Sequence, residues 1–573
     1  MILRHVKAKN YRNIDGIDVW LNADVNYIIG ENNLGKSNFL HLLEIVCSGK
    51  SFAENDYADE NLAIEVELQI IMCSGEFGFF GDNFDPDDES KIHLRYTQSI
   101  TDPYPSLICL DTDDSIHVKQ LRALDFYNYV STLQPSKELQ FDSSKGLGLF
   151  VKAVISEYID SNSPKLFNES DLDNIREYLN SDFKKIRGFK NYGIEAAVSH
   201  DDVDLLSDIF YLSDGERKLE NAGAGIQYTA MASISVLAHI MKLFKTKTVE
   251  FKSRLYETEQ GEKILPIIMA LDEPEVHLHP FLQRTLIKFY KRILKNQDKD
   301  FLELLKKHFE IDGLSGQLII VTHSTDAIMD DYRNIIRFFN HDGKVECIAG
   351  SNPNFSIRQS DEKHLIMRFP DFKEAFYSHV VILIEGVTEY GCVTEFANTM
   401  DIDLDEYGIC VINAQGEKSI KSLVSLFNSF GINTIAIYDG DVRNGKTPTD
   451  CEFYTNEPCF EFEVIKKLYD AGEYELIKNI ATDIYPHALT EVIDADFIKD
   501  PYVKKLKLDI NNYVPRAISA IPESDPEFYN VMSSWLYKKK DIFVGRIVGR
   551  SLTLEMIPDC YKKAISKAKE VAQ

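Results

Sequence analysis

The stretch that decides the fold is Gly30-Glu31-Asn32-Asn33-Leu34-Gly35-Lys36-Ser37, which matches the phosphate-binding pattern G-x-x-x-x-G-K-[ST]. An apolar run at 27–29 precedes it, and apolar residues recur at helical spacing from 39 to 46. In this context backbone N–H groups and the helix N-terminus bind phosphate. We predict a nucleotide site in which Lys36 reaches the β- and γ-phosphates and Ser37 binds Mg²⁺. Its residues are Gly30, Asn33, Gly35, Lys36, Ser37 and Asn38.

Two further apolar runs end in polar residues that suit the same site. The run 267–271 ends at Asp272-Glu273, and we predict that Asp272 holds the Mg²⁺ through water while Glu273 acts as the base for the attacking water. The run 317–321 precedes His323, which we expect to contact the γ-phosphate. Parallel strands would bring these residues to one sheet edge.

A small turn with Gly223 and Gly225 opens a long predicted helix and is a candidate phosphate-binding turn, with 212–215 as a competitor. The order of these motifs resembles ABC-type ATPase heads of the SMC and RecF kind over residues 1–370. That resemblance implies ATP, Mg²⁺ and dimerisation, with the glycine turn of one subunit completing the site of its partner. It also places Arg12 at a nucleotide-contacting position and leaves the Q-loop glutamine open between Gln69 and Gln98.

A second constellation of acids follows a fresh series of apolar strands. Glu385 ends the strand-like segment VVILIEG, and Glu389 lies one helical turn later. The segment TIAIYDGD ends with Asp439 and Asp441, whose i, i+2 spacing places both on one side of an extended chain. Acids gathered in this way would repel one another without cations, so we predict Mg²⁺ or Mn²⁺ here. The predicted metal ligands are Glu385, Glu389, Asp439, Asp441, Glu461 and Glu463.

This pattern, with Gly416 in NAQG between its acidic parts, resembles a Toprim domain. An ATPase head followed by a Toprim domain resembles the OLD (overcoming lysogenisation defect) endonucleases and the nuclease subunit of the Gabija anti-phage system. The resemblance implies a late lysine that stabilises charge at the scissile phosphate. Lys538, Lys539 and Lys540 are available and Lys540 is favoured; the resemblance leaves open which of Glu461 and Glu463 binds metal.

The expected fold is α/β in two parts: an ABC/SMC-like ATPase head with a helical dimerisation insertion, then a Toprim domain with a parallel sheet flanked by helices. The expected boundaries are 1–120 for the first ATPase lobe, 121–203 for the insertion, 204–370 for the second lobe and 371–573 for the Toprim domain with a helical tail.

Composition narrows the class of function. The chain has 573 residues and a net charge of −28, which disfavours a general basic nucleic-acid binder. Positive charge gathers after Trp535, where nine Lys and Arg stand against four Asp and Glu, so we expect DNA to follow a local basic path. We expect no membrane span, no export signal and no structural zinc site, and therefore a cytoplasmic protein.

The predicted function is a two-metal DNA endonuclease regulated by its ATPase module, in anti-phage defence. Glu385, Asp439, Asp441 and Lys540 form the predicted nuclease centre, and Glu273 is the base of the ATPase. Expected partners are DNA, further copies of the chain and a UvrD-like helicase. Two other classes stay open: a RecF- or SMC-like repair ATPase whose Toprim domain does not cut, and a topoisomerase or primase.

Overall fold

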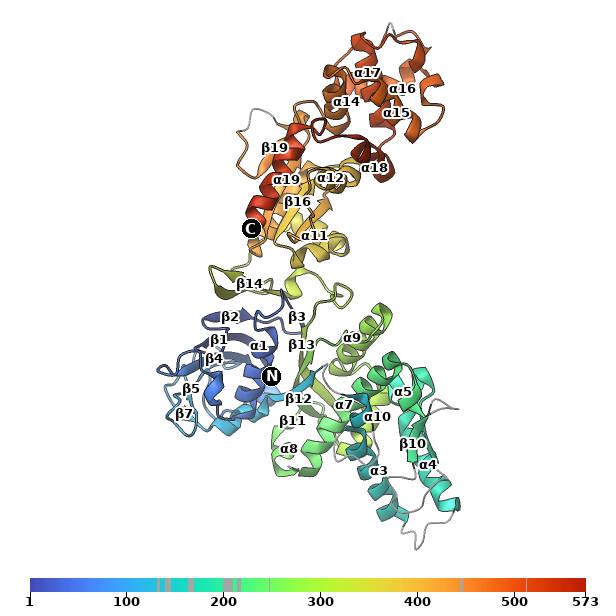
Figure 1. Ribbon diagram of the computed structural model, residues 1–573. Coiled ribbons are helices and arrows are strands. Elements are labelled where there is room, and N and C mark those ends of the chain that lie inside the picture. Colours follow the sequence, from blue (N-terminus) through green and yellow to red (C-terminus); the bar gives the residue numbers. More distant parts are fainter. Residues whose placement is uncertain are drawn as a thin grey trace. The chain divides into compact units, whose positions relative to one another are not determined.

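The computed structural model describes residues 1–130, 134–139, 146–162, 169–198, 210–213, 218–246, 248–443, 447–511 and 513–573. The chain divides into two compact units, Met1–Phe355 and Ser356–Gln573 (Figure 1). The observed boundary comes before the predicted one at 370. Helix α11 (Gln359–Phe372) belongs to the second unit, where it contacts α13 (Glu417–Ser429).

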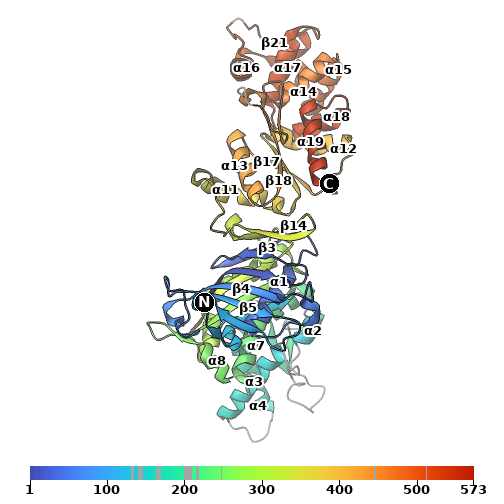
Figure 2. The same cartoon turned by 90° about the vertical axis from the view of Figure 1, so that its left-hand side faces the viewer.

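The first unit contains an antiparallel sheet in the order β2-β1-β4-β5-β6-β7, whose central strands run side by side in Figure 2. Buried and half-buried residues alternate along β4 and β5, the pattern of strands with one face on the core. The strands are β1 (Ile2–Lys9), β2 (Ile17–Trp20), β4 (Ile64–Ile71), β5 (Lys91–Gln98), β6 (Ser106–Cys109) and β7 (Ser115–Ile116).

A second, largely parallel sheet carries the nucleotide motifs. Its order is β11-β12-β13-β3-β14-β15, and β8 also pairs with β12. All five residues of β3 are buried, as expected for a central strand between helical layers. The strands are β3 (Val25–Ile29), β8 (Asp125–Val130), β11 (Tyr256–Glu257), β12 (Lys263–Asp272), β13 (Gly313–Val321), β14 (Ile335–His341) and β15 (Lys344–Ala349).

Helices α1 (Lys36–Ser48), α8 (Thr248–Arg254), α9 (Pro280–Leu294) and α10 (Lys299–Phe309) complete this α/β layer. Strand β8 corrects the predicted start of the helical insertion at 121, because its residues pair in parallel with Ile267–Asp272 of the largely parallel sheet. The aromatic and β-branched residues of DFYNYV favour a strand over a helix.

The helical region therefore begins after β8. It contains α2 (Pro135–Glu138), α3 (Gly146–Asn162), α4 (Glu169–Phe183), α5 (Arg187–Tyr192) and a strand pair, β9 (Glu195–Val198) with β10 (Phe210–Ser213). Helix α7 (Ala224–Thr246) follows and packs against α3 and α5. By length and composition α7 could cross a membrane, but 61% of its apolar window is buried within the protein, which is the character of a core helix.

The second unit is built on a four-stranded parallel sheet in the order β17-β16-β18-β19. Its strands are β16 (Val380–Ile384), β17 (Ile409–Asn413), β18 (Asn433–Tyr438) and β19 (Glu452–Tyr454). Helices α12 (Val387–Thr399) and α13 connect these strands, as parallel pairing requires. The predicted sheet and the helices around it are confirmed; β19 is an additional strand.

The rest of the second unit is helical, as expected. It contains α14 (Phe460–Asp470), α15 (Tyr474–Ile484), α16 (Ala495–Asp500), α17 (Pro526–Lys538), α18 (Ile542–Ser551) and α19 (Asp559–Ala572), with a small pair of strands, β20 (Val492–Ile493) and β21 (Arg516–Ala517). Helix α19 returns to the sheet and contacts β16 and β18, so the end of the chain contributes side chains beneath the strand ends.

Candidate functional sites

The loop between β3 and α1 has the backbone conformation that a phosphate cradle requires. Gly30, Asn33 and Gly35 all have positive φ, at 141°, 65° and 81°. A Cβ at Gly30 would lie 2.3 Å from the carbonyl oxygen of Phe338, so only glycine fits there. The Lys36 ammonium lies inside the loop and donates to the carbonyl oxygens of Gly30 at 3.0 Å and Glu31 at 2.5 Å.

The carboxyl ends of β3, β12 and β13 bring the other predicted residues to the same edge. Ser37 Oγ donates to Oδ1 of Asp272 at 3.0 Å. His323 Nε2 lies 3.6 Å from Oε1 of Glu273, which has a positive φ of 50°. Burial raises the pKa of Asp272 and lowers the pKa of Lys36. Burial therefore disfavours the charged form of both groups, and a charge of opposite sign bound beside either group would stabilise that form.

The other predicted nucleotide residue, Asn38, belongs to a network at the start of α1. Its Oδ1 accepts from Arg12 at 2.7 Å, and its Nδ2 donates to Asn13 at 2.7 Å. Arg12 also donates through Nε to Asp56 at 2.9 Å. These contacts give Arg12 and Asn38 a positioning role at the loop.

Neither glutamine considered for the Q-loop uses its amide on this loop. Gln98 accepts from the backbone N–H of Phe52 and donates to Asp102, while Gln69 contacts His93. Both amides therefore serve the antiparallel sheet.

Glu275 is a residue that the sequence pattern did not single out. Its Oε1 accepts from the backbone N–H of His323 at 2.6 Å, so it ties the segment after β12 to the segment after β13. Burial raises its pKa. In the sequence, Glu275 is visible only as the second glutamate of LDEPEVH. Its partner, the N–H of His323, becomes apparent only once strands β12 and β13 are paired.

Gly223 and Gly225 lie at the opening of α7, where the structure places the predicted glycine turn. A Cβ at Gly223 would meet no atom within 4 Å, whereas one at Gly225 would lie 3.3 Å from a methyl group of Leu282. Gly225 is thus fixed by packing and Gly223 faces open space. The competing segment 212–215 lies partly outside the described residues.

The second site lies at the carboxyl ends of β16 and β18. Glu385 follows β16, and its Oε2 accepts from the backbone N–H of Asp439, which follows β18, at 3.4 Å. Gly440 is required here because a Cβ would lie 2.4 Å from the carbonyl oxygen of Glu457. Gly416, with φ 126°, turns the chain into α13 after β17. The strand ends thus bring together the acids that the sequence separates by more than fifty residues.

Glu389, in the first turn of helix α12, is a buried acid beside these strand ends. Its side chain reaches back so that Oε2 accepts from the N–H of Gly386 at 2.6 Å, and Oε1 accepts from the hydroxyl of Tyr561 at 2.6 Å. Burial, reinforced by the nearby charge of Glu461, raises the pKa of Glu389 to about 7. Burial also raises the pKa values of Glu385 and Asp439. This excess of buried negative charge, offered by oxygen donors alone, fits a hard divalent cation.

Glu461 and Glu463, the two candidates left open as metal ligands, lie in different surroundings. They lie on helix α14, where i, i+2 residues point in nearly opposite directions. Glu461 faces the strand-end acids, and its charge acts on Glu389 and Asp439. Glu463 instead accepts from the backbone N–H of Glu457 at 2.7 Å and from Asn456 at 3.1 Å. Both would face the same side only in an extended chain.

The three consecutive lysines also separate. Lys540 Nζ lies 3.2 Å from Oε2 of Glu461, whereas Lys538 lies 3.9 Å from Asp500 and Lys539 lies 3.5 Å from Glu491. Lys540 is therefore the lysine of the three that the structure brings to the acid cluster.

Lys505 is a second cation at this site that the sequence pattern did not single out. Its Nζ lies 2.5 Å from Oδ2 of Asp441 and 3.8 Å from Oδ2 of Asp439. The run VKKLKL offers three lysines, and no spacing in it distinguishes the one that reaches the acids. We call Glu385, Glu389, Asp439, Asp441 and Glu461, with Lys505 and Lys540, the Toprim cluster.

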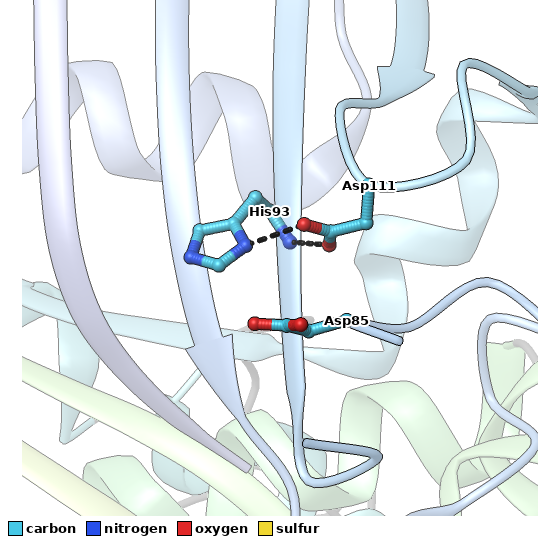
Figure 3. Close-up of side chains that lie close together, drawn as sticks. All are labelled: Asp85, His93 and Asp111. Carbon is cyan, nitrogen blue, oxygen red and sulfur yellow. Dashed lines mark hydrogen bonds and ion pairs between the residues drawn. The ribbon is translucent and has the colours of Figure 1, made fainter. Parts of the chain in front are cut away.

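A third group of side chains lies on the antiparallel sheet of the first unit, away from both sites. Asp85, His93 and Asp111 each offer a ligand atom within 4.8 Å of the others (Figure 3). Asp111 accepts from the backbone N–H of His93 at 2.8 Å and contacts its Nδ1 at 2.7 Å. These hydrogen bonds give the Asp111 carboxylate a structural role, because they hold the segment after β6 against β5.

Comparison with known proteins identifies both units. A model of the AAA ATPase domain matches residues 1–168 and 136–328, and a model of the overcoming lysogenization defect protein-like TOPRIM domain matches residues 376–441. The chain belongs to the AAA ATPase domain family and carries an OLD-like Toprim domain. The second match includes Glu385, Glu389, Asp439 and Asp441 of the Toprim cluster.

Two relatives match parts of the chain. The Old nuclease of Escherichia phage P2 is 21% identical over 315 residues, 54% of this chain and 46% of the relative. The RecF replication and repair protein of Chlamydia caviae is 42% identical over 52 residues, 9% of this chain and 14% of the relative. The OLD-like chain thus matches less than half the length of each relative.

Solved structures give weaker likenesses. An Smc head bound to a domain of ScpA matches with a TM-score of 0.38 and 14% identity, over 61% of this chain and 98% of that one. The C-terminal region of the Burkholderia pseudomallei OLD protein matches with a TM-score of 0.23 and 14% identity, over 34% of this chain and 100% of that one. At these scores the likenesses carry no functional inference.

Proposed function

We propose that this protein is a cytoplasmic DNA endonuclease that depends on a divalent cation and whose activity is controlled by nucleotide bound to the ATPase unit. The observation that carries the proposal is the Toprim cluster, in which five carboxylates from three segments converge on two lysines. The OLD-like TOPRIM match and the similarity to a protein named as a nuclease support it.

In the proposed site, Glu385, Glu389 and the Asp439/Asp441 pair would hold one Mg²⁺ or Mn²⁺, and Asp439 or Asp441 with Glu461 would hold a second. When bound, two such cations supply activation of water and stabilisation of the leaving oxygen. The chain contributes the positions of the acids: Gly386 and Tyr561 fix Glu389, and the N–H of Asp439 fixes Glu385. Lys540 is placed to balance charge that develops on the scissile phosphate.

The ATPase unit is proposed to bind ATP and Mg²⁺ through Lys36, Ser37 and Asp272, with Glu273 as base and His323 beside the γ-phosphate. The open surface at Gly223 suits the glycine turn for contact with a second copy of the chain, so we propose a homo-oligomer. A role in anti-phage defence and a UvrD-like helicase partner remain predictions from the family resemblance.

The deciding experiment is cleavage of supercoiled plasmid DNA with Mg²⁺ or Mn²⁺, with and without ATP. Wild-type protein is expected to nick or cut, and Glu385→Ala to lose this activity. The matched control is Glu374→Ala, an acid outside the Toprim cluster. Equal cleavage by wild type and Glu385→Ala would rule out the proposed centre.

The competing function is a DNA-repair ATPase with a Toprim domain that does not cut, which the short RecF match favours. That function predicts DNA binding and ATP hydrolysis without any metal-dependent cleavage. The same plasmid assay separates the two functions, because only the endonuclease converts supercoiled plasmid in the presence of the metal.

A further inference from the structure

Lys505 lies where its ammonium neutralises the acids of the Asp439-Gly440-Asp441 segment. Its Nζ is 2.5 Å from Oδ2 of Asp441 and 3.8 Å from Oδ2 of Asp439, and its side chain is only 16% exposed. An ammonium group that donates to Asp441 and forms an ion pair with Asp439 occupies space in which a divalent cation would bind the same carboxylates.

The charges of the Toprim cluster divide into two halves. Lys540 pairs with Glu461, and Lys505 pairs with Asp441 and Asp439. Burial and the charges of Glu389 and Glu385 raise the pKa of Asp439, while Lys505 opposes that rise. Without Lys505, Asp439 and Asp441 would lose the ammonium group that lies closest to their carboxylates, while the ammonium of Lys540 pairs with Glu461.

We propose that Lys505 is an internal counter-ion that competes with the divalent cation for Asp441 and Asp439 and leaves these oxygens when the cation binds. This inference rests on the proposed function, in which the Toprim cluster binds a divalent cation. A lysine suits the role because its charge sits on a flexible four-carbon stem that can withdraw without moving the backbone. The consequence is that the Lys505 ammonium neutralises these carboxylates when no metal is bound, and that a divalent cation must displace it in order to bind.

A purely structural ion pair makes the opposite prediction. If Lys505 served only to hold Asp441 in place for the metal, its removal would loosen the ligand and weaken metal binding. If it were an incidental surface contact, its removal would change nothing, because exposed ion pairs contribute little.

The test is Mn²⁺ binding to the full-length protein, followed by electron paramagnetic resonance of the free ion or by calorimetry, without DNA or nucleotide. The variant is Lys505→Met, which keeps the aliphatic stem and removes the charge. Its matched control is Lys504→Met, whose side chain is 72% exposed and lies 3.5 Å from Asp500 on the preceding helix. Lys505→Met is expected to bind Mn²⁺ at least about tenfold more tightly, and Lys504→Met within about twofold of wild type.

Unchanged or weaker Mn²⁺ binding by folded Lys505→Met would overturn the inference. A thermal melt adds a second readout: metal-free Lys505→Met should melt below wild type, and Mn²⁺ should raise its Tm by more. If Lys505→Met does not fold without metal, Lys505→Gln is the second variant, with the same expected direction.

The two levels of proposal fail in different ways. If wild type binds Mn²⁺ and Glu385→Ala weakens it, but Lys505→Met does not tighten it, only the counter-ion inference fails. If neither wild type nor Lys505→Met binds Mn²⁺, both the counter-ion inference and the proposed metal-dependent function fail.

Discussion

Lys540 Nζ lies 3.2 Å from Oε2 of Glu461, so the residue just beyond α17 meets the first turn of α14 inside the Toprim cluster. The Glu461 side chain is 1% exposed. Although burial by itself lowers the pKa of Lys540, the charge of Glu461 raises it above the usual value. Lys540 is therefore a permanent cation at neutral pH, placed beside acids that are proposed to hold metal.

The two glutamates of α14 should have different effects when neutralised. Glu461→Gln is expected to lower metal-dependent plasmid cleavage by about 100-fold or more, because it removes a metal ligand. Glu463→Gln is the matched control and should cleave within about threefold of wild type, because Glu463 bonds to residues 456 and 457 instead. Equal losses in the two variants would contradict the separation of the two side chains.

Among the consecutive lysines, only Lys540 is expected to matter for the chemical step. Lys540→Met should lower the single-turnover cleavage rate by about 100-fold, the usual effect of losing one charge-stabilising donor. Lys538→Met serves as the control, since Lys538 lies beside Asp500 and away from Glu461. Measuring DNA affinity for both variants separates a catalytic loss from weaker binding. A similar loss of rate in Lys538→Met would show that general positive charge is responsible.

Lys36→Ala should abolish nucleotide binding and leave the metal-dependent nuclease chemistry intact. The reason is that Lys36 belongs to the phosphate loop, whereas every member of the Toprim cluster lies in the other unit. Fluorescent ATP titration and plasmid cleavage without nucleotide test the two halves, with Lys50→Ala as control. Loss of cleavage in a folded Lys36→Ala protein that still binds DNA would contradict independent chemistry.

The Toprim cluster should make metal binding and stability depend on pH in opposite senses. The pKa of Glu389 is raised from 4.5 to about 7, so its contribution to the stability of the metal-free protein is full below 4.5 and lost as the pH rises through 7. Mn²⁺ must displace that proton, so Mn²⁺ affinity should rise between about pH 6 and 8.

Thermal melts at about pH 6, 7 and 8, with and without Mn²⁺, measure both effects. The metal-free Tm should fall with pH and Mn²⁺ should reduce the fall. Glu389→Gln should have a flatter pH profile in the absence of metal. An unchanged profile in that variant would assign the titration to another group.

Local sequence is sufficient to predict much of the fold. The phosphate loop, the apolar runs before Asp272 and His323, and the apolar runs before Glu385 and Asp439 each predict a buried strand with polar residues at its end. These predictions succeed because a fully buried parallel strand reads as a short, continuous apolar run. The predicted order of the two units, an ATPase head followed by a Toprim domain, is also confirmed.

The errors have a common physical origin. Residues 125–130 are predicted within a helical insertion because the partner of strand β8, β12, lies far along the chain. The choice between Glu461 and Glu463 stays open in the sequence because i, i+2 spacing means the same side on a strand, whereas on a helix it means nearly opposite sides. In both cases the residues are compatible with two local structures, and distant partners select one.

The sequence by itself determined the chemistry on offer: a phosphate-binding loop, strand-end carboxylates and lysines in the helical tail. Only the tertiary structure decided which of them meet. Glu461 distinguishes Lys540 from its two neighbours, Lys505 reaches Asp441 from a run of similar lysines, and Tyr561 reaches Glu389 from the last helix. Residue type and spacing describe neighbours along the chain. The interactions of charged groups depend instead on their distances in space, and here those groups come from segments that are far apart in the sequence.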